Sequence, residues 1–343
     1  MHFSLYINPQ TSGPDDDLKV MRNVAQHIEY CDQNGFDAVY LTEHHTTGYN
    51  AFADPFMFGA YLANRIRRMM LGFSVAVLPF HHPLRFATHC NLLDNFMEGR
   101  FIAGFGTGNS PLEYEAFGLS LDEKRNLVNE ALEVVLGCWR GDFEHHGKYW
   151  DVKVERIIPS PYTKPHPKVT RAVTSDDSLT DTARRGWPVL LGRFPEDRIK
   201  QYIDRYRGVL ESSNHSDETI TYCMDWVTSL KLVYLAESEE QAYQELRPSL
   251  VRYLIQAAKA NSSDYILEEQ ANEQAEDFIA RAMIVGTPKQ VADRIESYAD
   301  VGVSNMMIWT AFGSMPHEET IRTLRLFAEE VMPRFTRAPA GVR

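Results

Sequence analysis

The chain has 343 residues, 44% of them apolar, and its 35 basic and 47 acidic residues give it a net charge of −12. An acidic chain gains nothing from phosphate backbones or anionic lipid surfaces, and no apolar run approaches the ~20 residues that cross a bilayer, so we expect neither nucleic acid nor a membrane as a partner. The N-terminal stretch lacks a secretory pattern and the four scattered cysteines contain no CxxC pair, which favours a cytoplasmic protein with reduced thiols.

The first half of the chain alternates short apolar strands with amphipathic helices. Strands are predicted over residues 3–7, 36–41, 70–78 and 100–108. The helix after the first strand has an apolar face made of Leu18, Met21, Ala25 and Ile28. Another helix is predicted over residues 82–96, and a capping-box pattern from Ser120 to Glu123 predicts the start of the next one.

The second half continues the alternation. Strands are predicted over residues 168–175, 187–192, 225–236 and 303–312. Helices are predicted over residues 176–186, 196–210, 238–258 and 316–331, and Thr287-Pro288 has the pattern of a further helix start. Eight strands and about eight helices in strict alternation favour an α/β protein, a (β/α)8 TIM barrel formed as one domain by residues 1–343.

Two stretches interrupt this alternation. Residues 141–167 are aromatic, rich in proline and hairpin-like, and residues 261–281 carry six acids against one arginine with weak periodicity. Insertions this long in a compact domain are often lids or interface arms. For residues 261–281, a disordered surface loop is an equally open alternative.

Glu43, His44 and His45 follow the second predicted strand, at the end where a barrel places its catalytic groups. Strand alternation sends His44 to one side and the other two residues to the opposite side, so one imidazole can face a central pocket while the others brace it. His44 is therefore a candidate for proton transfer. Because His81 and His82 end the third strand, a metal site stays open as an alternative, although no HxH or HExxH pattern occurs and no metal is expected.

The fourth strand ends in GFGTGN, Gly104 to Asn109. Glycines there allow the backbone to approach a flat or anionic ligand closely, with Thr107 and Asn109 as the expected contacts, while Gly104 could equally reflect tight packing. The spacing is GxGxG, Pro111 intervenes, and the next helix is expected only near Ser120. A dinucleotide fingerprint is therefore absent.

Ser175 and Ser178 lie at the predicted start of another helix. Free N–H groups and hydroxyls at a helix start can bind an anion. Ordinary capping by Ser175 or Asp176 is an equally open alternative, and Asp176 and Asp177 would weaken phosphate binding unless they point outward.

Six segments in this order resemble the bacterial luciferase-like, flavin-dependent monooxygenases: GFDAVYLTEHH, LGFSVAVLPFHHPLR, NLLDNFMEGRFIAGFGTG, IVGTP, VSNMMIW and MPHEETIRTLRLFAEEVMP. The resemblance runs over almost the whole chain. It implies a (β/α)8 barrel that binds flavin mononucleotide (FMN) at the carboxyl ends of its strands.

The resemblance also implies roles for individual residues. His44 matches the histidine that supports the oxygenated flavin and proton transfer, with Glu43 and His45 as its neighbours in the pocket. Ser74 and Val75 fall where the family has a non-prolyl cis peptide under the flavin ring. The match further implies that the flavin phosphate is held by Ser175 and Ser178, and that residues 261–281 fall in the region of a mobile active-site loop.

The chain departs from the light-emitting members after the fourth strand. They carry a reactive cysteine followed by a phosphate-binding arginine, where this chain has Gly106 and Thr107. Arg193 is the candidate that would compensate for the missing charge. Light emission is therefore not expected, and a related oxygenation is.

The resemblance predicts a two-component monooxygenase in which a separate flavin reductase supplies reduced FMN. The flavin would react with O2 to form a C4a-(hydro)peroxide that oxygenates a small organic substrate, and the enzyme is expected to be a homodimer. The expected substrate walls, each of which could instead be barrel core, are His45, Phe56, Trp309 and Phe312. Two alternatives stay open: a hydride-transferring enzyme that uses a deazaflavin, and a flavin-binding protein without turnover.

Overall fold

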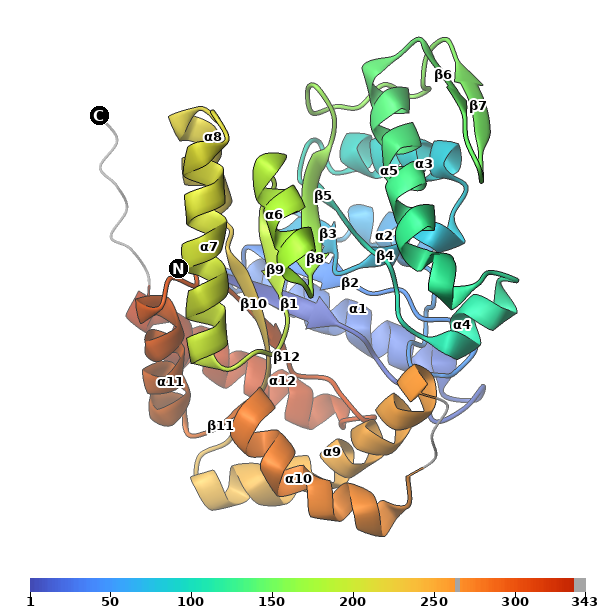
Figure 1. The fold of residues 1–343 in the computed structure, drawn as a ribbon. Coiled ribbons are helices and arrows are strands. Elements are labelled where there is room, and N and C mark those ends of the chain that lie inside the picture. The colour runs from blue at the N-terminus through green and yellow to red at the C-terminus, as the bar shows by residue number, and fades with distance from the viewer. Residues whose placement is uncertain (263–265, 336–343) are drawn as a thin grey trace.

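The computed structural model describes residues 1–262 and 266–335. Its centre is a closed barrel of parallel strands, which confirms the predicted fold class (Figure 1). The barrel strands are β1 (His2–Ile7), β2 (Ala38–Leu41), β3 (Met70–Phe73), β5 (Phe101–Gly106), β8 (Lys168–Val173), β9 (Val189–Leu191), β10 (Thr228–Leu235) and β12 (Asn305–Trp309). Pairing of β9 with β10, and of β12 with both β10 and β1, closes the ring.

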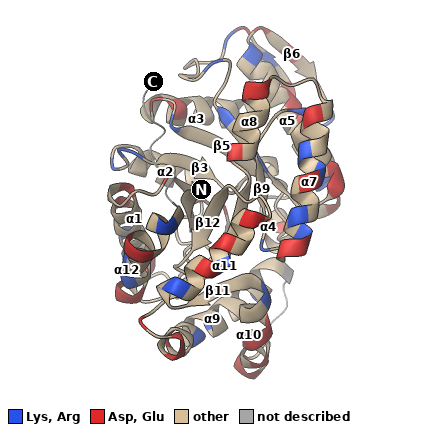
Figure 2. Cartoon of the chain, turned by 90° about the vertical axis from the view of Figure 1, so that its left-hand side faces the viewer, with Lys and Arg blue, Asp and Glu red and all other residues tan. Residues whose placement is uncertain are grey.

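Helices surround the barrel, as the view in Figure 2 shows for α1, α3, α7 and α12 around the central strands. Their bounds are α1 (Asp17–Gln33), α2 (Pro55–Ala63), α3 (Pro83–Phe96), α4 (Pro111–Ala116), α5 (Lys124–Arg140), α6 (Asp176–Arg184), α7 (Glu196–Ser212), α8 (Asp217–Asp225), α9 (Glu239–Ser262), α10 (Glu268–Ala282), α11 (Pro288–Asp300) and α12 (His317–Leu326). A π-helical turn, Phe327–Val331, continues α12. Two short strands, β4 (Ala76–Val77) and β11 (Met283–Gly286), pair with β5 and β10.

Side-chain alternation along the strands separates two apolar regions. Residues with one parity pack outward against the helices, for example Phe3, Leu5 and Ile7 of β1. Residues with the other parity fill the barrel interior, where a buried cluster consists of Ala38, Tyr40, Ile102, Leu190 and Met307. The interior is therefore a packed core, and a ligand can be bound only where the strands end.

The third predicted strand is interrupted at the barrel rim. It ends as β3 at Phe73, the Ser74–Val75 peptide bond is cis as the family resemblance implied, and the chain resumes as β4. Neighbouring β5 carries glycines where this segment approaches it. A Cβ on Gly104 would lie 1.7 Å from the Phe73 carbonyl oxygen, and one on Gly106 would lie 2.7 Å from Val75 Cγ2. The tight-packing interpretation of Gly104 is therefore confirmed.

The capping box predicted at Ser120 is wrong. The Ser120 side chain makes no capping hydrogen bond, a 3-10 turn covers Leu121–Glu123, and α5 begins at Lys124. The Glu123 carboxylate, which would have reached back to the Ser120 N–H, instead accepts hydrogen bonds from Lys148 and Tyr149. A long-range contact thus replaces the local one that the pattern predicted.

The first insertion, residues 141–167, contains the predicted hairpin. Strands β6 (Phe143–His146) and β7 (Asp151–Val154) pair in antiparallel fashion. Glu130 of α5 accepts hydrogen bonds from the backbone N–H groups of Tyr149 and Trp150 at 2.9 Å. This partly buried carboxylate fixes the hairpin turn onto the helix.

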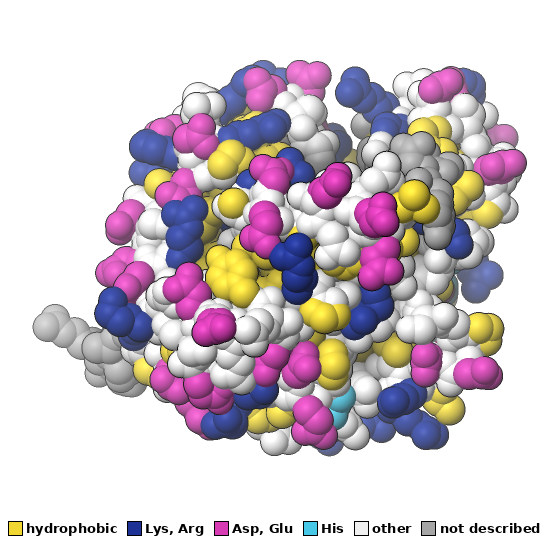
Figure 3. Space-filling model, turned by 90° about the horizontal axis from the view of Figure 1, so that it is seen from below, with side chains coloured by type: hydrophobic (Ala, Val, Ile, Leu, Met, Phe, Trp, Pro, Cys, Tyr) yellow, Lys and Arg dark blue, Asp and Glu magenta, His cyan; other side chains and the backbone are white. Residues whose placement is uncertain are grey.

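The second insertion, residues 261–281, is largely helical, so the disordered-loop alternative is wrong for its described part; residues 263–265 lie outside the described residues. Helix α10 buries Ala271, Ala275 and Phe278 and lies beside α9 at the bottom of Figure 1. Seen from below, the surface is a mixture of acids, bases and small apolar patches (Figure 3). Its role as a lid stays a prediction.

All four cysteines, Cys31, Cys90, Cys138 and Cys223, are buried and unpaired, which agrees with the scattered spacing in the sequence. Burial raises the pKa of the Cys31 and Cys90 thiols well above the usual range, so they stay protonated and unreactive. Among the described residues, no helix combines the length and the apolar character that crossing a membrane requires.

Candidate active site

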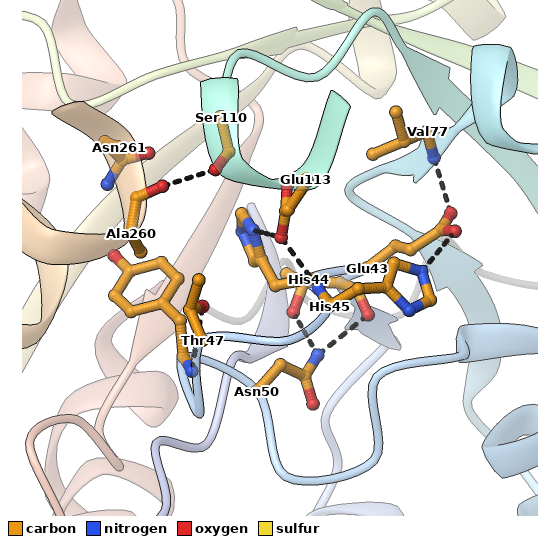
Figure 4. Close-up of polar contacts among 12 residues, drawn as sticks. Glu43, His44, His45, Thr47, Asn50, Val77, Ser110, Glu113, Ala260 and Asn261 are labelled. Carbon is orange, nitrogen blue, oxygen red and sulfur yellow. Dashed lines mark hydrogen bonds and ion pairs between the residues drawn. The ribbon is translucent and has the colours of Figure 1, made fainter. Parts of the chain in front are cut away.

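Glu43 connects three segments at the carboxyl end of the barrel (Figure 4). Its side chain is buried, and one oxygen accepts a hydrogen bond from His45 Nε2 at 2.9 Å. The other oxygen accepts from His81 Nε2 at 2.9 Å and from the backbone N–H of Val77 at 2.6 Å. Because Val77 lies two residues after the cis peptide, Glu43 braces that segment against the end of β2.

The contacts of Glu43 keep its carboxylate ionised and favour the protonated form of His45. Burial alone would raise the pKa of Glu43, but the nearby His81 and the hydrogen bonds from His45, His81 and Val77 lower it. Burial alone would lower the pKa of His45, but its hydrogen bond to Glu43 and the charge of Glu43 raise it. The carboxylate thus stays ionised and can act as a fixed brace.

The side chain of His44 points away from those of Glu43 and His45, as strand alternation predicted. Its partner is Glu113 of α4. The distance from His44 Nδ1 to Glu113 Oε1 is 3.1 Å, and the same oxygen accepts the backbone N–H of His45 at 2.7 Å. The Glu113 side chain is 1% exposed, whereas that of His44 is 23% exposed. A carboxylate on Nδ1 fixes the tautomer and leaves Nε2 of His44 available to a ligand.

Sequence reasoning missed Glu113, because residues 111–119 were expected to be a loop before a helix near Ser120. The structure instead has α4, which begins at Pro111 and places Glu113 in its first turn. The available signal was proline at the first helical position followed by an acid in the first turn. The Ser110 hydroxyl, which donates to the carbonyl of Ala260, ties the start of α4 to the end of α9 (Figure 4).

Thr107 and Asn109, the predicted ligand contacts after the fourth strand, lie between β5 and α4. Thr107 Oγ1 donates to the Gly108 carbonyl at 3.1 Å, and Asn109 Oδ1 accepts from Lys124 Nζ at 2.7 Å. Lys124 therefore supplies a cation to the loop where the light-emitting members have an arginine. Binding of a ligand by these two residues stays a prediction.

Ser175 and Ser178 form a complete capping box at the start of α6. The Ser175 hydroxyl accepts from the Ser178 N–H at 3.3 Å, and the Ser178 hydroxyl accepts from the Ser175 N–H at 3.2 Å. Asp176, which could have repelled a phosphate, pairs with Arg205 of α7. The capping interpretation is thus confirmed, and the role of this helix start in phosphate binding stays a prediction.

Arg193 lies in an aromatic cluster over the barrel mouth. Its Nη1 donates to the hydroxyl of Tyr253 at 2.5 Å, and its guanidinium lies 5.6 Å from the ring centre of Phe278. The ring of Trp309 lies 5.1 Å from those of Tyr6 and Tyr253. The predicted wall residues Trp309 and Phe312 are both part of this cluster, with ring centres 6.2 Å apart.

The other two predicted wall residues lie elsewhere. Phe56 is buried outside the barrel, with its ring 4.8 Å from Phe73 and 5.3 Å from Phe86, so the core alternative describes it. The imidazole of His45 packs edge-on against the ring of Phe117 at 4.9 Å. Both residues contact the Glu43 group and do not line the mouth: His45 through its hydrogen bond to Glu43, and Phe56 through an edge contact with His81.

The barrel mouth is closed by its own aromatic side chains. Tyr49 is 6% exposed, and Tyr253 and Trp309 are each 2% exposed. Two cavities of about 530 and 720 Å³ lie elsewhere, one at the opposite end of the barrel beside Phe3 and the other between α3 and β7 beside Leu84. The aromatic cluster thus packs tightly over this part of the barrel mouth.

The chain was compared with known proteins. A sequence model of the family described as luciferase-like monooxygenase matches residues 1–305. The oxygenase component of the flavin-dependent trigonelline monooxygenase of Acinetobacter baylyi is 24% identical over 100% of this chain and 98% of its own. The crystal structure of monooxygenase RslO1 from Streptomyces bottropensis has a TM-score of 0.85 and 27% identity, over 98% of this chain and 100% of its own.

A second solved structure is similar over its full length. It is the oxygenating constituent of 3,6-diketocamphane monooxygenase from Pseudomonas putida, a type II Baeyer–Villiger monooxygenase in complex with FMN. It has a TM-score of 0.82 and 19% identity over 99% of both chains, a likeness that concerns the fold. Because the family match covers most of the sequence and the barrel with its cis peptide agrees with it, the chain belongs to the luciferase-like monooxygenase family.

Proposed function

We propose that the chain is the oxygenase component of a two-component monooxygenase that uses reduced FMN and O2 to oxygenate a small organic substrate. The single observation that supports this most is the His44–Glu113 pair, a half-buried imidazole held by a buried carboxylate at the carboxyl end of the barrel. The trigonelline relative is named as an oxygenase component, and the diketocamphane enzyme binds FMN. Since the chain lacks a nicotinamide fingerprint, a separate reductase would supply the reduced flavin.

The residues at the barrel mouth fit a flavin. Gly104 and Gly106 of β5 let the cis segment at Ser74–Val75 pack closely against that strand, at the rim where the family resemblance places the flavin ring. The start of α6 has the first-turn N–H groups that every helix start offers to an anion, and the charge of Asp176 is offset by Arg205. That arrangement suits a phosphate.

When bound, the reduced flavin supplies the oxygen-activating chemistry. Nε2 of His44 gives or takes the proton at the reacting oxygen, and Glu113 stabilises the imidazolium that results. Glu43 holds His45, His81 and the segment after the cis peptide in place. Tyr49, Tyr253 and Trp309 keep water out of the mouth, because all three are buried.

The test is the variant His44→Ala, measured for FMN binding and for oxygenation of an aldehyde, a bicyclic ketone and a phenol. We expect the FMN affinity of His44→Ala to stay within about threefold of that of the parent. Product formation should fall by about 10²-fold or more, which is the usual effect of losing a proton-transfer group. Unchanged product formation in His44→Ala would remove the basis of the assignment. His82→Ala, a change at an exposed histidine, is the matched control.

The alternatives make different predictions in the same assay. A deazaflavin enzyme would bind that cofactor in preference to FMN and would consume no oxygen. An inert flavin carrier would bind FMN and give no product with any substrate. The intact His44–Glu113 pair favours turnover, because a carrier has no need for an oriented imidazole.

A further inference from the structure

Arg193 is a largely buried arginine that, within the described residues, has no carboxylate partner. Its hydrogen-bond partner among these residues is the hydroxyl of Tyr253. Other arginines of comparable burial pair with acids: Arg171, 12% exposed, pairs with Asp181, and Arg322, 24% exposed, pairs with Glu245. A buried cation without a counter-charge costs free energy unless a ligand brings one.

The surroundings of Arg193 keep this charge uncompensated. Tyr253, Tyr49 and Tyr6 are the groups that face it. Burial raises the pKa of Tyr6 and of Tyr49 well above the usual range, so both phenols are neutral at physiological pH. Although burial opposes the charge of Arg193, the tyrosine oxygens around it raise its pKa, so the guanidinium stays protonated. The cluster therefore carries a net positive charge in a medium of low polarity.

The position of Arg193 is fixed by the fold. Lys231 of β10, which is 1% exposed, donates through Nζ to the carbonyl of Phe194 at 2.7 Å. Tyr253, the hydrogen-bond partner of Arg193, packs edge-on against Trp309 at 5.1 Å. Both ends of the Arg193–Tyr253 hydrogen bond are thus anchored, one through the backbone and the other through α9.

The same cluster reaches the candidate proton-transfer group. The ring of Tyr49 stacks with that of Tyr253 at 6.3 Å and meets the imidazole of His44 edge-on at 4.8 Å. A small ligand that replaced Tyr49 in this row would contact the guanidinium of Arg193 on one side and the imidazole of His44 on the other. Tyr49 therefore links the aromatic cluster around Arg193 to the candidate proton-transfer group.

We propose that Arg193 and Tyr253 form an oxyanion subsite that binds an acidic oxygen group of the substrate, such as a carboxylate, a phenolate or an enolate. This proposal rests on the proposed oxygenase function, and it specifies that the substrate of that reaction is acidic. A guanidinium presents paired N–H donors that suit two oxygens or one charged oxygen, and the phenol adds a third donor. The flavin phosphate is the other possible oxyanion for this subsite. Comparing FMN with riboflavin, which lacks the phosphate, distinguishes phosphate binding from substrate binding.

The experiment compares benzoate with its neutral isostere benzamide, and FMN with riboflavin, by calorimetry on the apo protein and on the protein loaded with oxidised FMN. The variant is Arg193→Gln, and Arg193→Lys retains the charge without the paired donors. Arg171→Gln is the matched control, because Arg171 is a buried arginine that already has a carboxylate partner. Far-UV circular dichroism verifies that each variant is folded.

We expect the parent protein to bind benzoate at least about tenfold more tightly than benzamide, the usual worth of a charge-assisted hydrogen bond. Arg193→Gln should abolish that preference and leave FMN affinity unchanged, Arg193→Lys should keep part of it, and Arg171→Gln should keep it all. Loss of FMN affinity without loss of riboflavin affinity would overturn the proposal and assign Arg193 to the phosphate. An unchanged preference for benzoate in Arg193→Gln would overturn it as well.

The two proposals can fail separately. Binding of benzoate needs no turnover, so its dependence on Arg193 can be measured even if no oxygenation is found. Conversely, a parent protein that oxygenates neutral substrates and shows no preference for benzoate would retain the proposed function and lose the oxyanion subsite.

Discussion

Glu113 is the residue whose removal tests the orientation of His44. In Glu113→Gln the amide oxygen still accepts a hydrogen bond, but the negative charge beside the imidazolium is lost. We expect kcat to fall about tenfold or more, because the imidazole loses the carboxylate that orients it and offsets its charge during proton transfer. Glu115→Gln, an exposed change on the same helix, should leave kcat unchanged. An unchanged kcat in Glu113→Gln would show that the charge of Glu113 does not assist His44.

The site residues differ in how far the sequence could predict them. Glu43, His44 and His45 were predictable, because they follow a clear strand and strand alternation assigns their sides. Glu113 and Tyr253 were not predictable, because each meets its partner across a long stretch of sequence, with separations of 69 and 60 positions. No local pattern encodes such a contact, and it exists only once the barrel has closed.

Helices α1 and α12 meet through a pair of histidines that should make stability depend on pH. His27 is 3% exposed, and its Nε2 lies 3.0 Å from Nδ1 of His317. Burial, together with His317, lowers the pKa of His27 to about 3. An unfolded histidine has a pKa of about 6.5, so protons bind the unfolded chain preferentially between these values.

Stability should therefore be highest above pH 6.5 and fall as the pH drops from about 6.5 toward 3, at up to about 1.4 kcal/mol per pH unit from this group. Urea unfolding at pH 7, 6 and 5 measures the slope. His27→Gln should reduce the slope, and His82→Gln, a change at an exposed position, should leave it as it is. Equal slopes in the parent protein and His27→Gln would show that His27 makes no contribution.

The hairpin of β6 and β7 depends on one carboxylate of α5. Glu130 accepts the backbone N–H groups of Lys148, Tyr149 and Trp150. We expect Glu130→Ala to lower the free energy of unfolding by about 2 kcal/mol and to expose the hairpin turn to proteases, because these N–H groups lose a charged acceptor. Glu133→Ala, one helical turn away and 65% exposed, removes only a 3.9 Å pair with His145 and none of these N–H contacts, so it serves as the control. If the hairpin of Glu130→Ala resists proteases as well as that of the parent protein, strand pairing alone holds it in place.

The elements of the barrel were largely predictable, since each strand carries an apolar run and each helix an amphipathic period. The wrong predictions concern segments whose structure depends on contacts or packing that the local sequence does not show. At Ser120 the predicted capping box does not form, because Glu123 instead binds Lys148 of the hairpin. In residues 266–281 the weak apolar period concealed α10, because alanines such as Ala271 and Ala275 form most of its buried face. Small side chains give a weak hydrophobic signal even when they pack fully.

At the scale of the whole molecule, α2 and α3 carry apolar side chains that the single chain leaves exposed. Met57 and Tyr61 of α2 are 72% and 47% exposed, and Phe96 of α3 is 55% exposed. We propose that this face forms the interface of the expected homodimer, since the two helices pack side by side. Light scattering should give twice the chain mass for the parent protein and the single chain mass for the double variant Met57→Asp, Tyr61→Asp.

The control for the dimer is Leu18→Asp, because Leu18 is 55% exposed and belongs to α1, not to α2 or α3. This variant should remain dimeric. A parent protein that is monomeric at micromolar concentration, or a dimer that persists in the double variant, would contradict the assignment of this face.

The central claim is that the barrel mouth binds reduced FMN beside His44 and controls its reaction with oxygen. The most direct measurement mixes the protein, loaded anaerobically with one equivalent of reduced FMN, with oxygenated buffer and follows the flavin absorbance. We expect a transient species that precedes the return of oxidised flavin, longer lived in the parent protein than in His44→Ala. Reoxidation at the rate of free flavin, with no transient and no difference between the two proteins, would contradict the account.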